Sequence, residues 1–470
     1  MSKRALPALA IALLALLAPS SHAPAHAAPA KVEAPVLEPK FSVERYSLAN
    51  GLRVVLNPDP SSPTVAVVVW YDVGSRNEKA GEGGFAHLFE HMMFEGSANF
   101  PRGMHDKLVE GRGGKLNAST SEDWTRYYEI MPAGELGLTL FLEADRMKSL
   151  HVDQEAFENQ RKVVQEEYRM RVDNSAYTKG YFRLMELVYE GYHPYAHPAI
   201  GSMPELDAAK LDWVKAFHAA WYAPNNAVLV VSGDFDPKEA RALVDKHFAG
   251  VPKVDVAKYP DLPFAGRKTP SGPEPVIDPN ARTPKVYFGW SIPKDRTPEH
   301  YALELASVIL SDGESSRLHR RLVKDLAIAQ SAGASTEDHR GPDAFVLEAH
   351  LSDKATVEEV EKAIWAELDD LAKKGPTEAE MKKARAKVEH GFLFGLQSNL
   401  QRANALAKME GHHGDASLLL GEPKRYAAVT AAEVKAAVAK YLVRATLAHV
   451  RVMPPPKPEG PKPAPKKEGK

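Results

Sequence analysis

Two histidines and a glutamate stand close together in the segment Gly83–Met93, with the spacing H-x-x-E-H. On a helix, His87 and His91 would project from the same face, one turn apart. Two neutral imidazoles placed in this way can hold one zinc ion at about 2.0–2.1 Å. Glu90 borders the same face, where its carboxylate can take a proton from a water molecule that zinc has acidified. The spacing therefore predicts a zinc site with Glu90 as general base, although an amphipathic helix with two surface histidines is the other interpretation.

A catalytic zinc site needs a third protein ligand and an open coordination position. The predicted helix Gln154–Arg171 offers two adjacent carboxylates, Glu166 and Glu167. Glu167 follows Val163 and Val164 at helical spacing, so we expect it on their inward face. Glu166 falls instead among charged residues, on a solvated edge. An unpaired carboxylate on an apolar face is costly, and zinc would supply a partner. We therefore predict Glu167 rather than Glu166 as the third ligand.

Hydrophobic periodicity predicts the elements that must position these residues. Strands are expected at 44–47, 53–56, 65–72, 115–121, 124–131, 227–232, 286–292 and 448–452, with a turn at Asn50-Gly51. Helices are expected at 84–94, 103–111, 136–147 and 154–171, with a solvated helix at 357–374. His105 and His197 are interpreted as surface or capping residues. Gly411–Asp415 is interpreted as the turn that ends a helix.

The chain begins with features of an export signal. Lys3 and Arg4 precede an apolar run that ends near Ala18, and small-x-small sites follow at 21–23 and 25–27. This pattern predicts a secretory signal peptide over residues 1–27, with an N-terminal anchor helix as the alternative. No later segment approaches about 18 uninterrupted apolar residues, so we expect no stable membrane insertion. We predict a periplasmic protein, with extracellular release left open.

Bulk composition excludes several classes of function. The net charge of -2 gives no electrostatic footprint for nucleic acid or for an acidic membrane surface. The sequence has 0 cysteines, which excludes disulfides, thiolate metal sites and a cysteine nucleophile. A chain of 470 residues is too long for one ordinary core, so two or more domains are expected.

Proline-rich stretches and an internal similarity divide the chain. We predict a flexible leader at 28–40, a zinc-bearing domain at 41–251, a Pro-rich linker at 252–284, a second homologous domain at 285–453 and a disordered Pro/Lys tail at 454–470. Val214-Lys215-Ala216 precedes Trp221 as Val434-Lys435-Ala436 precedes Tyr441. A closing strand follows each of these helices. The halves are therefore interpreted as copies of one unit, with chance similarity of Ala-rich helix ends as the alternative.

These motifs resemble the pitrilysin/insulinase-type zinc metallopeptidases, the family that includes the mitochondrial processing peptidase and bacterial half-length members. The order H-x-x-E-H is the inverzincin signature. The resemblance spans about Phe41 to Met453 and also rests on the runs Arg161–Glu167, Gly113–Thr120 and Asp123–Tyr128. It implies an α+β fold of two homologous domains, each a mostly antiparallel sheet with helices packed on one side.

The resemblance also assigns roles to single residues. Glu167 matches the family's third zinc ligand, which implies one zinc ion per chain. Asn117 and Ala118 match an edge strand that pairs with an extended peptide substrate near its scissile bond. Gln160 stands where several members have a second Glu that supports the site, and an amide can still hydrogen-bond there. The stretch that contains Ile200-Gly201 matches a recurring segment that we interpret as structural.

The sequence departs from the family at two positions in its second half. Where full-length members carry an Arg and a Tyr that grip the substrate, this chain has Val323 and Gln330. In bacterial half-length pairs one subunit carries zinc and the other carries the Arg and Tyr. The resemblance therefore implies the zinc-bearing subunit of a heterodimer, whose homologous partner supplies that pair.

We expect an exported zinc metalloendopeptidase that hydrolyses extended oligopeptides. Two other functions stay open at this point. One is a non-catalytic peptide-binding or assembly subunit on the same fold. The other is a zinc hydrolase that acts on something other than peptides, and only the edge-strand segment around Asn117 speaks against it.

Overall fold

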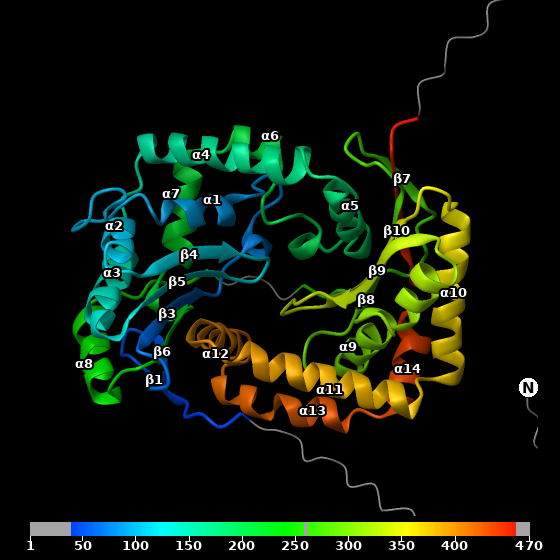
Figure 1. Ribbon diagram of the computed structural model, residues 1–470. Helices are drawn as coiled ribbons and strands as arrows, with labels where there is room; N and C mark the ends of the chain where they lie inside the picture. Colours follow the sequence, from blue (N-terminus) through cyan, green and yellow to red (C-terminus); the bar gives the residue numbers. More distant parts are fainter. Residues whose placement is uncertain (1–38, 258–261, 457–470) are drawn as a thin grey trace, which may run out of the picture. The chain divides into compact units, whose positions relative to one another are not determined.

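The computed structural model describes residues 39–257 and 262–456 (Figure 1). The predicted signal peptide and most of the predicted leader and tail lie outside these ranges. The described residues belong to one contact-defined unit, Val36–Lys470. Among them, no helix is long and apolar enough to cross a membrane.

The first half of the chain forms a six-stranded sheet in the order β1-β2-β6-β3-β5-β4. Its strands are β1 (Glu44–Ser47), β2 (Arg53–Pro58), β3 (Thr64–Tyr71), β4 (Lys115–Thr120), β5 (Thr125–Pro132) and β6 (Ala227–Gly233). All neighbouring strands are antiparallel except β2 and β6. The eight strand predictions, compared with the strands of both halves, are confirmed within two residues at each end.

Helices of the first half cover one face of this sheet. They are α1 (Phe85–Met92), α2 (Met104–Glu110), α3 (Leu136–Ser149), α4 (Gln154–Tyr168), α6 (Met203–Ala208), α7 (Leu211–Trp221) and α8 (Pro237–Phe248). Strand β3 shows why both faces must be covered, because it is a continuous run of β-branched and aromatic residues. Val65, Val67 and Val69 belong to the core beneath these helices, whereas Ala66 and Val68 belong to a second core on the opposite face.

A helix from the second half covers that opposite face. Helix α12 (Asn399–His413) packs Ala403 and Leu406 against β3 and β6. Arg402 of α12 is buried and donates hydrogen bonds to Asn57 Oδ1 (3.1 Å) and to Asp59 Oδ2 (2.5 Å) of the first half. The first sheet therefore has helices of its own half on one face, as predicted, and α12 of the second half on the opposite face.

The second half repeats this arrangement with a five-stranded sheet, in the order β7-β11-β8-β10-β9. Its strands are β7 (Glu274–Ile277), β8 (Lys285–Ile292), β9 (Ala329–Thr336), β10 (Asp343–Leu351) and β11 (Ala448–Met453). As in the first sheet, one parallel pair, β7 with β11, is followed by antiparallel pairs. The shared order supports the predicted internal repeat, and the predicted α+β class is confirmed.

Helices again cover both faces of the second sheet. The remaining helices are α5 (Thr178–Val188), α9 (Pro298–Ser311), α10 (Val357–Lys374), α11 (Glu378–Gly395), α13 (Glu422–Ala428) and α14 (Ala431–Tyr441). Helices α9, α10 and α14 form the core on one face, and α5 of the first half packs on the other. Each half therefore lends one helix to the sheet of the other.

The predicted domain boundaries remain proposals. One structural observation bears on the predicted linker, because part of it forms a strand. Residues 274–277 of the stretch 252–284 form β7, which pairs with β11 as part of the second sheet. Proline is compatible with this position because β7 is an edge strand.

Candidate metal centre and cleft

The start of helix α1 is fixed by a buried carboxylate. Gly84 at the N-cap has a left-handed backbone with φ +88°. Glu78 accepts hydrogen bonds from the backbone N–H of Gly84 (3.1 Å) and of Ala86 (2.7 Å). His197 Nε2 lies 3.1 Å from Glu78 Oε2, the oxygen that also accepts from Gly84. These contacts hold the first turn of α1, which carries His87, and they make His197 a half-buried support of this turn.

The stretch interpreted as structural also meets this turn. A Cβ atom on Gly84 would lie 2.8 Å from the Ile200 carbonyl oxygen, and one on Gly201 would lie 2.5 Å from the Gly83 carbonyl oxygen. These distances are too short for a Cβ atom, so the backbones at Gly84 and Gly201 can approach so closely only because both residues are glycine. The structural interpretation of Ile200-Gly201 is confirmed.

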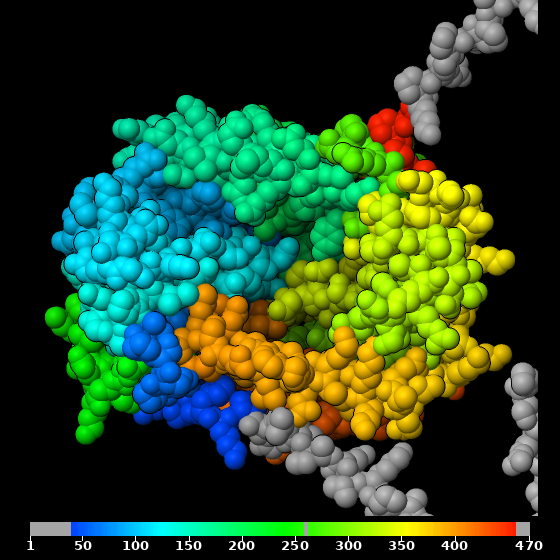
Figure 2. All heavy atoms as spheres, viewed as in Figure 1, coloured from blue at the N-terminus to red at the C-terminus, as the bar shows by residue number. Residues whose placement is uncertain are grey.

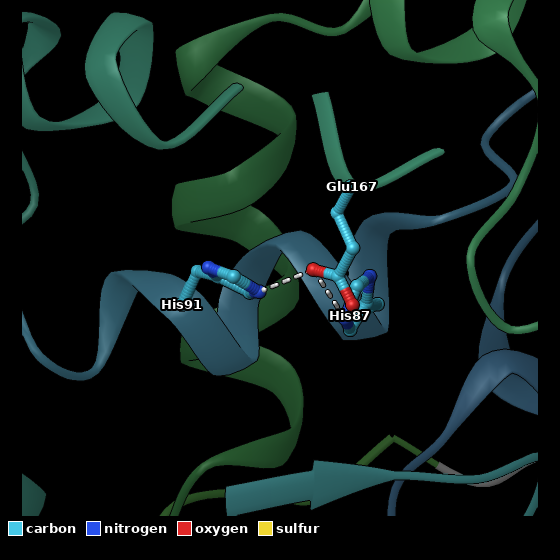
Figure 3. Close-up of side chains that lie close together, drawn as sticks. All are labelled: His87, His91 and Glu167. Atoms are coloured by element: carbon cyan, nitrogen blue, oxygen red, sulfur yellow. Dashed lines mark ion pairs between the residues drawn. The ribbon is translucent and has the colours of Figure 1, made fainter. Parts of the chain in front are cut away.

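Three predicted metal ligands converge in the structure (Figure 3). One ligand atom from each of His87, His91 and Glu167 can be chosen so that all three lie within 4.8 Å of one another. Glu167 Oε2 lies 3.7 Å from His87 Nε2 and 3.3 Å from His91 Nε2. Helix α1 supplies both imidazoles from one face, and α4 supplies the carboxylate.

The chemistry of this donor set fits a zinc ion. Two imidazole nitrogens and one carboxylate oxygen are a known catalytic set for zinc, and the fourth position stays open for water or substrate. Burial lowers the pKa of His87 to about 4, so its imidazole is neutral at pH 7, which is the form that binds metal. For His91, burial lowers the pKa, but hydrogen bonding to Glu167 and the charge of Glu90 outweigh it and raise the pKa overall.

Glu167 divides its two oxygens between different partners. Oε2 faces the histidines, whereas Oε1 forms an ion pair with Arg171 Nε at 3.0 Å. The hydrogen bond to His91, together with the charges of His87 and Arg171, lowers the pKa of Glu167 and keeps it ionised. Arg171 lies in the π-helical turn Arg169–Asp173 that follows α4, and the sequence analysis did not identify it.

The choice of Glu167 over Glu166 agrees with the geometry, but one reason given for it was wrong. Glu166 is not part of the group of converging ligand atoms, and it pairs with Arg169. Val164 is buried, as expected, whereas Val163 is 46% exposed and lines the cleft beside the three ligands. The inward face of α4 is therefore narrower than predicted, and Glu167 belongs to it through Val164.

Gln160 connects His91 to a further carboxylate. Its Oε1 lies 3.2 Å from His91 Nδ1, and its Nε2 donates to Glu95 Oε1. Because a carboxylate can only accept, the amide must turn its N–H group toward Glu95 and its oxygen toward His91. His91 then carries its proton on Nδ1 and leaves Nε2 free for a metal. Arg102 holds the second oxygen of Glu95 at 3.0 Å.

Glu90 lies beside the same cleft and is held by strand β4. The Thr120 hydroxyl donates to Glu90 Oε2 at 2.5 Å. Burial raises the pKa of Glu90 above its usual value, which brings it toward that of a general base working near neutral pH. Thr120 was not identified from the sequence, because only the pairing of β4 against β5 places it over α1.

The cleft has a volume of about 840 Å³ and is bounded by α1, α4 and β4. Figure 2 shows the visible surface hollowed between α4 and the cyan strands. Asn117 and Ala118 both line this cleft from β4. Within the described ranges, β4 pairs with β5 on one side and with no strand on the other. Its free edge can therefore accept another strand.

A second group of metal-type residues is a structural ion network. His105, Glu129 and Glu143 are buried and lie within 4.8 Å of one another. Arg146 lies among them, paired with Glu143 and 3.4 Å from Glu129 Oε1. A guanidinium already supplies the compensating charge, so this group offers no open position for a metal. The interpretation of His105 as a surface or capping residue was wrong, because a lone His gives no sign of its buried partners.

Neither Val323 nor Gln330 reaches the metal ligands' cleft in this chain. Val323 lies in the π-helical turn His319–Asp325, and Gln330 in β9 donates to the Leu351 carbonyl at 2.9 Å. A valine and a glutamine cannot supply the cation and the phenol that an Arg and a Tyr would bring to these positions.

Comparison with known proteins decides the family. The model described as insulinase (peptidase family M16) matches residues 53–183, and that described as peptidase M16 inactive domain matches residues 209–388. The zinc protease PqqE of Helicobacter pylori is 34% identical over 375 residues, covering 77% of this chain and 82% of its own length. The chain belongs to peptidase family M16.

Other M16 relatives agree with this assignment and with the fold. A crystal structure of a protease from Helicobacter pylori matches with a TM-score of 0.83 and 30% identity, over 88% of this chain and 100% of that one. The mitochondrial-processing peptidase subunit beta of Lentinula edodes is 24% identical over 417 residues, which cover 85% of this chain and 87% of its own. An M16 inactive domain from Pseudomonas fluorescens shares the fold, with a TM-score of 0.76 at 21% identity over 88% of this chain and 98% of that one. The predicted resemblance to the insulinase-type family is confirmed.

Proposed function

We propose that the chain is an exported zinc-dependent endopeptidase that hydrolyses extended oligopeptides, and that it is the zinc-bearing subunit of a heterodimer. The observation that carries the proposal is the convergence of His87, His91 and Glu167 in one cleft with Glu90 and a free strand edge. The names of M16 relatives as zinc proteases support the choice of metal and reaction.

Each residue of the cleft has a role that follows from its position. His87, His91 and Glu167 would hold the metal. When bound, zinc would polarise the scissile carbonyl and acidify water. The edge of β4 around Asn117 and Ala118 would align the peptide through backbone hydrogen bonds, which demand little of its sequence.

Glu90 would move the proton. Its Oε2 accepts the Thr120 hydroxyl, so Oε1 is left to take a proton from the attacking water. Transfer of that proton to the nitrogen of the breaking peptide bond would release a neutral amine and return Glu90 to its ionised form. The raised pKa of Glu90 favours this exchange, because the carboxylate must accept and then release the proton near neutral pH.

The heterodimer rests on what stands at Val323 and Gln330, neither of which can grip a substrate as an Arg and a Tyr would. A homologous partner would supply that pair. Export to the periplasm rests on the signal-peptide pattern of residues 1–27. The second candidate is a non-catalytic peptide-binding subunit, which the same free edge of β4 would serve.

The test is hydrolysis of a quenched peptide library by the chain alone and with a homologous M16 partner. Zinc content is measured in the wild type, in Glu90→Gln and in Glu167→Gln, with Glu166→Gln as the matched control for metal content. We expect one zinc per chain in the wild type, in Glu90→Gln and in Glu166→Gln, loss of zinc in Glu167→Gln, and cleavage that needs both the partner and Glu90. Full activity of the lone chain would refute the heterodimer. Zinc without cleavage in any pairing would favour the non-catalytic subunit.

A further inference from the structure

A second cavity lies on the opposite face of the first sheet from the metal ligands. It has a volume of about 310 Å³, at the lower end of the range for ligand pockets. Trp70 and Trp124 form its floor and stack with ring centroids 4.6 Å apart. The C-terminal end of α11 and residues 401–408 of α12 also line it, and we call it the Arg126 cavity after its cation.

Arg126 carries a positive charge that the chain does not pair. Its guanidinium lies 4.7 Å from the Trp124 ring, and no carboxylate within residues 39–257 and 262–456 forms an ion pair with it. Its Nε is buried and has no hydrogen-bond partner in the same ranges. Burial lowers the pKa of Arg126, and electrostatic interactions with Tyr128 and Glu90 offset this only in part. An uncompensated, half-buried cation is costly, and an incoming anion would offset the cost.

The rest of the cavity leaves this charge in excess. Lys408 also lines it, but Lys408 is already paired with Asp338 at the same wall. Asn404 is buried, and its Oδ1 has no hydrogen-bond partner among the described residues. The cavity therefore offers one net positive charge together with a buried acceptor. A carboxylate next to an N–H donor, as in a peptide, satisfies both.

Two glycines keep the cavity open. Gly391 and Gly395 of α11 line it, and a Cβ atom on either would meet nothing within 4 Å. Neither has a left-handed backbone, so the fold does not require glycine at these positions. A glycine inside a helix costs about 1 kcal/mol relative to alanine. The two glycines therefore lower the stability of α11 and enlarge the cavity, a combination that favours a cavity occupied by a ligand.

The cavity is close enough to the free edge of β4 to meet a bound peptide. Arg126 of β5 pairs in register with Ser119 of β4, so their side chains share one face of the sheet. A peptide residue opposite Ser119 would present its side chain on that face, about 10 Å from the Arg126 backbone, twice the spacing of neighbouring strands. Ser119 is small, and the arginine and glutamate side chains together can span this distance above it.

We propose that the Arg126 cavity binds a carboxylate of the peptide substrate, either an acidic side chain or the C-terminal carboxylate. This inference rests on the proposed function, because the ligand arrives as a strand on β4. It makes Arg126 a specificity-determining residue outside the metal site. The substrate class is then extended peptides that place a carboxylate, from an acidic side chain or from the C-terminus, over this cavity.

The test measures binding rather than cleavage, on the Glu90→Gln chain paired with the homologous M16 partner of the proposed function. Fluorescence anisotropy compares labelled peptides that carry Glu or Gln at each position in turn, each as a free acid and as a C-terminal amide. We expect a Glu at one position, or the free acid, to bind about tenfold more tightly than its neutral counterpart. This preference should weaken as salt rises, because the pair is partly exposed. Amidation distinguishes the two sources of the carboxylate.

Two further substitutions separate recognition from folding. Arg126→Gln should abolish the preference while leaving the affinity for the neutral peptide unchanged. Gly391→Leu should also weaken binding of the acidic peptide, although its melting temperature should be equal to or above that of the parent chain. Equal loss for acidic and neutral peptides in Arg126→Gln would overturn the inference, because it would show a structural role. Unchanged acidic-peptide binding in Gly391→Leu would also overturn it.

The outcomes also separate this inference from the function on which it rests. Peptides that bind the Glu90→Gln chain with no preference for acid would overturn the inference alone. Failure of every peptide to bind would overturn both the peptidase proposal and the carboxylate site.

Discussion

Replacing Glu95 with leucine should weaken zinc binding, although Glu95 contacts none of the three ligands directly. In the native chain Glu95 accepts the Gln160 amide N–H, which turns the amide oxygen toward His91 Nδ1. Without Glu95 the amide can rotate and present its N–H group to Nδ1 instead. His91 would then favour the tautomer that carries its proton on Nε2, where the metal must bind.

The size of this effect follows from the hydrogen bond that is lost. The contact between Gln160 Oε1 and His91 Nδ1, 3.2 Å long, is a neutral hydrogen bond worth roughly 0.5–1.5 kcal/mol, and an unmatched buried polar group costs about 1–3 kcal/mol. We therefore expect zinc affinity to fall about 10- to 100-fold, the range typical of changes next to a metal ligand. That range corresponds to about 1.4–2.7 kcal/mol.

The assay is competition for zinc with a chromophoric chelator at fixed pH. Arg102→Gln is the matched control, because it removes the other partner of Glu95 and leaves the acceptor for Gln160 in place. Adding Gln160→Glu to Glu95→Leu should restore much of the affinity, since a carboxylate can only accept from Nδ1–H. Unchanged zinc affinity in Glu95→Leu, with the fold intact, would refute this account of how His91 is oriented.

Three other predictions concern single charged side chains. Arg171→Leu should reduce zinc affinity several-fold in the same assay, because Glu167 Oε1 loses its partner; unchanged affinity would contradict this. Arg402→Met should lower the free energy of unfolding by about 1–3 kcal/mol in urea titrations, since buried Asn57 and partly exposed Asp59 lose their partner. Burial lowers the pKa of His300, but its contacts with Asp343 and Glu304 raise it overall to about 10. The protonated native state is therefore stabilised below pH 6.5, and this stability, on the order of 4 kcal/mol, should be lost as pH rises toward 10. His300→Gln should flatten that alkaline decline, and an unchanged slope would contradict the assignment.

The metal ligands could be predicted because their spacing is local. His87, Glu90 and His91 share one helical face, and Val164 fixes the inward face on which Glu167 lies. Strand β3 could be predicted because its β-branched run has no helical alternative of comparable strength. In these segments local propensity and burial point to the same structure.

The supporting residues could not be predicted, because their contacts join distant parts of the chain. Thr120 reaches Glu90 only after β4 has paired with β5. Arg171 reaches Glu167 through a π-helical turn, which has no clear sequence signal. Glu95 and Gln160 meet across two elements, and nothing in either segment alone marks the contact.

Strand β7 could not be predicted either, because the prolines of the predicted linker do not favour a strand. Pro275 lies within β7, and a count of prolines favours an extended linker over a strand. Proline lacks a backbone N–H, but an edge strand has one side on which no donor is needed. The position of β7 at the end of the sheet, which the sequence does not reveal, makes proline acceptable there.

The placement of α12 on the first sheet has a consequence for synthesis on the ribosome. Strand β6 ends at Gly233, whereas α12 begins only at Asn399. At about 5–20 residues per second, translation of the intervening chain takes on the order of 10–30 s. During that delay the side of the nascent sheet formed by Ala66, Val68 and Trp70 lacks α12 and is covered only in part, by Phe41 and Val43. The emerging chain must therefore be shielded from aggregation until α12 has been made.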